Sequence, residues 1–69
     1  MVEVFKTNVK KSREAKMLLL ILAEYFPNHK INFDLNDCDK ILRMEGNSLI
    51  PESVVDLIIA NNYECVTLD

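Results

Sequence analysis

The residues best suited to binding a ligand lie where a predicted strand passes into a predicted helix. This stretch contains Lys10, Lys11, Ser12 and Arg13, which combine three positive charges with a hydroxyl. The first amides of a helix have no partner within the helix, and nearby cations strengthen anion binding there. The stretch therefore predicts a site for a carboxylate, a phosphate or the acidic surface of a partner protein. Because no glycine lets a ligand approach this backbone closely, a solvated basic surface is the alternative.

The distribution of charge along the chain also places the positive end of the molecule at this stretch. The 69 residues carry a formal net charge of −3, with a pI of about 5.0, which argues against a nucleic-acid-binding protein. Residues 1–16 nevertheless hold five basic and two acidic residues, so this part is positive and the remainder is strongly acidic. We expect an electrostatic dipole whose positive end attracts acidic partners.

Three other side chains are candidate ligands for a soft metal ion. Cys38 and Cys65 are the only cysteines and form no CxxC pair, and His29 is the only histidine. This spacing predicts neither a disulfide framework nor a zinc knuckle. The simpler interpretation makes Cys38 a turn residue, Cys65 a small apolar residue of a strand and His29 an exposed loop residue. Metal binding through any of the three is left open.

The acidic turn and the remaining polar residues give little support to catalysis. Asp34, Asn36, Asp37 and Asp39 offer oxygen ligands but lack the glycine and the closing glutamate of a calcium loop, so we expect a solvated turn. No serine or cysteine has a nearby histidine to activate it, and no paired carboxylates occupy predicted core positions. The sequence therefore predicts that the protein is not an enzyme.

Two helices follow from apolar residues at three- and four-residue spacing. The first is predicted over about residues 13–26, with Ser12 as the N-cap and Pro27 as the stop. Its expected inner stripe is Ala15, Leu18, Leu19, Leu22, Tyr25 and Phe26. The second begins near Pro51 and stops at Asn61–Asn62, since asparagine tolerates left-handed geometry.

Four strands are predicted, over residues 2–7, 31–35, 41–45 and 63–68. In the first, Phe5 and the following Val9 are the core candidates, which leaves Val2 and Val4 on the opposite face. The element order β-α-β-β-α-β predicts the ferredoxin-like α+β sandwich, with four antiparallel strands and both helices on one face. We expect one domain over residues 1–69, for which the open sheet face or an edge strand is a candidate homodimer interface.

This order of elements resembles the heavy-metal-associated domain, the fold of small copper chaperones and of metal-ATPase N-terminal modules. The segment from Ile59 to Cys65 resembles the end of the family's signature, where Gly-Tyr follows the second helix, with Asn62 in place of the glycine. The family binds Cu(I) or Zn through a Gly-Met-x-Cys-x-x-Cys loop. Registering Val9 on the methionine places Lys11 and Glu14 at the two cysteine positions. The resemblance therefore implies a divergent member without the usual metal site and without a cofactor.

These observations lead to two alternative functions. The first is a small non-enzymatic interaction or regulatory module whose partner is an acidic protein or a second copy. The second is a metal-handling protein that binds copper or zinc at a non-standard site involving Cys38, Cys65 or His29. The N-terminal residues lack a signal-peptide pattern, and the longest apolar run is too short for a membrane span. We therefore expect a cytoplasmic protein that does not bind membranes.

Overall fold

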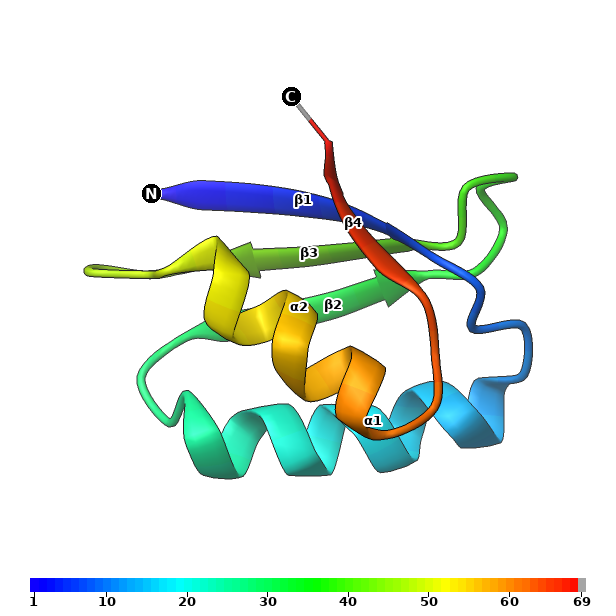
Figure 1. Cartoon of the computed structure of the whole chain (residues 1–69), viewed down its shortest axis with the longest axis horizontal. Coiled ribbons are helices and arrows are strands. Elements are labelled where there is room, and N and C mark those ends of the chain that lie inside the picture. Colours follow the sequence, from blue (N-terminus) through cyan, green and yellow to red (C-terminus); the bar gives the residue numbers. More distant parts are fainter. Residues whose placement is uncertain (69) are drawn as a thin grey trace.

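The computed structural model describes residues 1–68 and confirms the predicted α+β ferredoxin-like arrangement. Four strands form one antiparallel sheet in the order β2-β3-β1-β4. Both helices cover the same face of this sheet, with α1 beneath β2 and α2 beside β4 (Figure 1). The elements are β1 (Val2–Thr7), α1 (Ser12–Tyr25), β2 (Lys30–Asp34), β3 (Ile41–Glu45), α2 (Pro51–Ala60) and β4 (Cys65–Leu68).

The core lies between the sheet and the two helices. Phe5 in the central strand is fully buried and lies opposite Leu42 on one side and Thr67 on the other. Phe5 and Val9 are both buried as predicted, whereas Val2 is 46% exposed on the other face. The buried apolar residues are Phe5, Val9, Ala15, Leu18, Leu22, Leu42, Met44, Leu49, Val54, Ile58 and Cys65.

Helix α1 buries a narrower stripe than predicted. Leu18 and Leu22 are fully buried, but Tyr25, which was expected in the stripe, is 66% exposed. Tyr25 is the last helical residue, and the following Phe26 packs against the core in its place. Leu20 is two residues from both Leu18 and Leu22, which is a rotation of about 200° around the helix axis. It therefore lies on the opposite side of the helix and is 75% exposed.

The prediction of Ser12 as the N-cap is wrong by one residue. Ser12 is the first helical residue, and Lys11 occupies the N-cap with extended geometry. The backbone N–H of Lys11 donates to Glu14 Oε1 at 3.1 Å. In a capping box, the glutamate three residues after the N-cap makes this contact. The position of Glu14 therefore favours Lys11, rather than Ser12, as the N-cap. At the other end, the helix stops before Pro27 as predicted.

Three strand boundaries also differ from the sequence prediction, the first being that β2 begins at Lys30 rather than Ile31. β2 ends at Asp34 rather than Leu35, because Asp34 Oδ1 accepts a hydrogen bond from the N–H of Asn36 and begins the turn. β4 begins at Cys65 rather than Tyr63, because the N–H of Tyr63 still bonds to a carbonyl of α2. Asn62 has φ 71°, which confirms the expected left-handed stop after α2.

The chain's single glycine lies beneath the only histidine. The ring of His29 packs so closely on Gly46 that a Cβ at this position would overlap the imidazole. His29 Nε2 lies 3.2 Å from the carbonyl oxygen of Asn47, and its ring meets Phe26 edge-on. The side chain of His29 is therefore half-buried and packs against the residue that follows β3. The prediction that His29 is an exposed loop residue is wrong.

Candidate functional site

The junction between β1 and α1 is closed by hydrogen bonds to the segment before β4. Asn8 Oδ1 accepts from the N–H of Glu64 at 2.8 Å. The hydroxyl of Tyr63 donates to Glu14 Oε2 at 3.0 Å. These contacts join residues that are about fifty positions apart in the sequence, so they fix the segment from Asn8 to Glu14 against the far end of the chain. We call this segment, which includes the first residues of α1, the basic loop.

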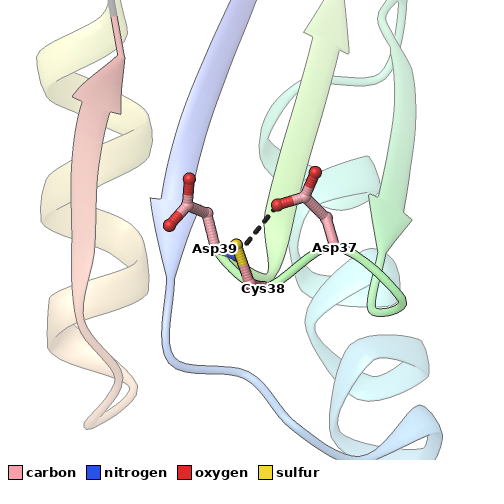
Figure 2. Close-up of side chains that lie close together, drawn as sticks. All are labelled: Asp37, Cys38 and Asp39. Atoms are coloured by element: carbon pink, nitrogen blue, oxygen red, sulfur yellow. Dashed lines mark hydrogen bonds between the residues drawn. The ribbon is translucent and has the colours of Figure 1, made fainter.

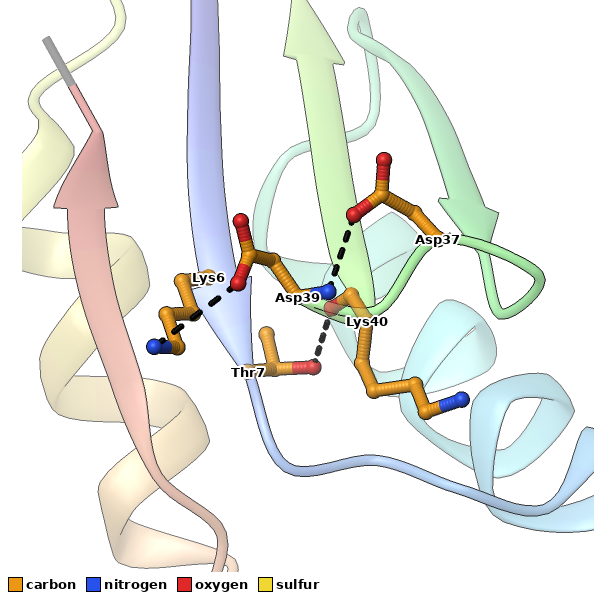
Figure 3. A network of polar contacts seen from close by, with 5 residues as sticks. All are labelled: Lys6, Thr7, Asp37, Asp39 and Lys40. Carbon is orange, nitrogen blue, oxygen red and sulfur yellow. Dashed lines mark hydrogen bonds and ion pairs between the residues drawn. The ribbon is translucent and has the colours of Figure 1, made fainter.

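A second set of contacts ties the end of β1 to the turn between β2 and β3 (Figure 3). Thr7 is 6% exposed, and its hydroxyl donates to the carbonyl of Lys40 at 2.6 Å and accepts from the N–H of Val9 at 3.2 Å. The N–H of Thr7 donates to the carbonyl of Asp39 at 3.1 Å. Thr7 therefore satisfies its buried polar groups and orients the chain as it leaves the sheet.

The predicted binding residues project from this fixed junction. Lys10, Lys11, Ser12 and Arg13 are all exposed. Within residues 1–68, none of the three cations forms an ion pair; the two ion pairs present, Lys6–Asp39 and Arg43–Glu45, lie elsewhere. The structure thus gathers the residues of the predicted anion or partner site at one place, and their role stays a prediction.

Glu14 changes the chemistry expected at the start of α1. Its carboxylate already accepts from the N–H of Lys11, so one helix-start donor is occupied by a side chain of the protein itself. The bond from Tyr63, with smaller contributions from Lys11 and Lys10, lowers the pKa of Glu14 below its ordinary value. An external anion would therefore meet the side chains of Lys10, Lys11 and Arg13 more readily than the amides.

The two positions that the resemblance assigns to metal ligands are occupied differently here. Lys11 is exposed and cationic, and the carboxylate of Glu14 is engaged by Tyr63 and by the backbone of Lys11. An ammonium is not a metal ligand, and a carboxylate is a hard ligand compared with a thiolate. These residues do not form a site for a soft ion.

One other group of potential ligands lies in the turn between β2 and β3 (Figure 2). Asp37, Cys38 and Asp39 present one ligand atom each, and these atoms lie within 4.8 Å of one another. Asp37 Oδ1 accepts from the N–H of Asp39 at 2.8 Å, and Asp39 Oδ1 lies 3.7 Å from Lys6 Nζ. The turn thus accounts for the position of the Asp37 carboxylate, and a surface ion pair accounts for that of Asp39.

The structure does not bring the other candidate ligands into this group. Cys65 is 5% exposed, and burial raises the pKa of its thiol to about 11. A buried thiol with a raised pKa stays protonated at neutral pH, as expected for the predicted small apolar residue. Both cysteines are free, with Cys38 exposed and Cys65 in β4.

Sequence reasoning missed a groove beside the outer strand β2. The groove has a volume of about 500 Å³ and lies between β2 and the first half of α1. Its apolar lining includes Leu19, Phe33 and Leu35, and Lys16 and Asp34 lie among its polar lining. Phe33 and Leu35 are half-buried there, which only the folded chain shows.

The chain was compared with family models, curated proteins and solved structures, and none of the three comparisons finds a match. In the part of the chain that the structure describes, no helix combines the length and apolar character needed to cross a bilayer. The site is therefore interpreted from its own geometry.

The contact between Glu14 and Tyr63 predicts a pH-dependent contribution to stability. Folding lowers the pKa of Glu14 from 4.5, so the ionised carboxylate stabilises the fold above pH 4.5, and this is lost as the pH falls through the lowered pKa. The same bond raises the pKa of Tyr63 from 10.0. The hydroxyl proton that Tyr63 donates is therefore present below pH 10, and its contribution to stability is lost above the raised pKa.

Tyr63→Phe keeps the ring and removes the donor. We expect the difference in free energy of unfolding between wild type and variant to be largest between pH 4.5 and 10 and to shrink on either side. Chemical denaturation across this range measures it, with Tyr25→Phe, an exposed tyrosine of α1, as the control. A difference that does not change with pH would contradict the assigned contact.

Proposed function

We propose that the protein is a non-enzymatic interaction module that binds the acidic surface of a partner protein through Lys10, Lys11 and Arg13. The observation that carries the proposal is the exposure of three cations, none of which forms an ion pair with a described residue, on a loop fixed at both ends. We also propose that the chain is a divergent relative of the heavy-metal-associated domain, on the strength of the element order and the segment from Ile59 to Cys65.

The fixed backbone supports binding because it lowers the entropy lost when a partner docks. Asn8 and Glu14 attach the two ends of the loop to the segment before β4, and Thr7 attaches β1 to the turn before β3. The long side chains of the three cations keep their own freedom, so they can adapt to carboxylates in different positions. Positive charge at one end of an acidic protein also orients the partner as it approaches.

Metal binding at Asp37, Cys38 and Asp39 is the alternative function. It is favoured by the proximity of the three ligand atoms and by the exposed position of the Cys38 thiol. The roles of both carboxylates in the turn and in the ion pair with Lys6 count against it. We therefore favour protein binding over metal binding.

A binding experiment with an acidic probe tests the proposed function. We expect a polyglutamate peptide to shift the amide resonances of residues 8–14 in a titration of labelled protein, more strongly at low salt than at high salt. The variant Lys10→Ala/Lys11→Ala/Arg13→Ala should bind roughly tenfold or more weakly, since three surface charge contacts are lost.

A matched control separates the loop from a general effect of charge. Lys6→Ala/Lys16→Ala/Arg43→Ala removes the same number of positive charges from exposed positions outside the loop. This variant should keep most of the affinity for the peptide. Equal loss of affinity in the two triple variants would remove the loop from the proposal.

The alternative predicts a measurable metal complex. If the turn binds metal, native mass spectrometry with one equivalent of Zn²⁺ under reducing conditions should give an adduct that Cys38→Ser abolishes and Cys65→Ser retains. An adduct unaffected by Cys38→Ser, or no adduct in the wild-type protein, would exclude this turn as a zinc site.

A further inference from the structure

β2 is an outer strand with a free backbone edge. Within residues 1–68 it pairs only with β3, and the groove beside it leaves the edge uncovered by α1. An uncovered edge presents unpaired N–H and C=O groups to which another strand can bind. The groups exposed on this edge determine which strand fits.

The register identifies the outward-facing groups as those of Ile31 and Phe33. The N–H of Gly46 donates to the carbonyl of Met1 at 2.9 Å, which makes this pair a hydrogen-bonded one. Hydrogen-bonded pairs recur at every second residue along antiparallel strands. Met44, two residues before Gly46, therefore also directs its N–H and C=O groups toward β1, and the neighbouring Arg43 directs its groups toward β2. Asn32, the partner of Arg43, therefore bonds to β3, and its neighbours on either side point outward.

We propose that β2 is a dimer interface, at which a second copy of the chain pairs antiparallel with β2 about a two-fold axis at Asn32. In this register Ile31 of each copy lies opposite Phe33 of the other, and their outward N–H and C=O groups bond in both directions. The two sheets then join into one continuous sheet with all helices on the same face. This proposal is independent of the basic loop.

The charges on β2 are self-complementary in this register. Lys30 lies opposite Asp34 of the second copy, and the symmetry repeats the pair on the other side of the axis. These are non-hydrogen-bonded positions, where opposing side chains approach most closely and opposite charges attract. A shift of two residues removes both pairs, and a parallel arrangement places like charges side by side. The pattern therefore selects one register and one orientation.

The apolar side chains favour the same arrangement. Ile31 and Phe33 are half-buried on the helix side of the sheet, and the second copy would place an apolar residue beside each of them. The groove lined by Leu19, Phe33 and Leu35 would be covered by the second copy. The other outer strand lacks this complementarity, since antiparallel pairing of β4 about Val66 sets Glu64 against Leu68.

Charge reversal tests the interface. We expect the wild-type protein to form a concentration-dependent dimer in sedimentation velocity. Lys30→Asp and Asp34→Lys should each raise the dimer dissociation constant roughly tenfold or more, because each turns two attractive pairs into two repulsive ones. An equimolar mixture of the two variants should form a heterodimer, since every opposing pair at these positions is again Lys with Asp. Asp56→Lys, on the exposed face of α2, is the control and should dimerise like wild type.

The heterodimer distinguishes a lost interface from a damaged fold. Asp34→Lys also removes the acceptor for the N–H of Asn36. Asp34→Asn keeps an oxygen acceptor and removes only the charge, so it separates the effect of the lost charge on dimerisation from the effect of a changed turn. In the wild-type dimer, amide hydrogen exchange of Ile31 and Phe33 should slow with rising protein concentration. A wild-type chain that stays monomeric, single variants that dimerise normally, or a mixture that stays monomeric would each overturn the proposal. Loss of dimerisation in the basic-loop triple variant would contradict its independence from that loop.

Discussion

The position of β1 between β3 and β4 is the constraint on which the rest of the structure depends. Phe5 is fully buried there and contributes to the layer that both helices cover. Thr7 ends the strand and anchors the turn that precedes β3. Because β1 pairs on both sides, a one-residue change in its register would turn Phe5 to the other face of the sheet and would disturb its pairing with both β3 and β4.

The same strand determines the chemistry of the junction that follows it. In the family that the sequence resembles, the loop at this place holds a metal through two thiolates. Here Asn8 and Glu14 accept hydrogen bonds from Glu64 and Tyr63, so these two side-chain oxygens have partners within the chain itself. What faces solvent is a set of long cationic side chains, which suits recognition of a surface better than enclosure of an ion.

Periodicity was enough to predict the order of elements and the sheet face of Phe5, and residue type was enough to predict the stops at Pro27 and Asn62. It misplaced the N-cap because a serine at position 12 is a common cap, whereas the deciding contact comes from the carboxylate of Glu14. The bond between Glu14 and Tyr63, and the groove beside β2, depend on segments that meet only in the folded chain. No local pattern contains that information.

Contacts within the chain close the β1–α1 junction, and this closure leaves a measurable trace. Amide hydrogen exchange of Glu64 tests it most directly, because this exposed residue's N–H is held by Asn8 Oδ1. We expect slow exchange in the wild-type protein and selective loss of that protection in Asn8→Ala, with the core amides of β1 unchanged. Exchange of Glu64 at the rate of an unstructured peptide, or protection that survives Asn8→Ala, would contradict it.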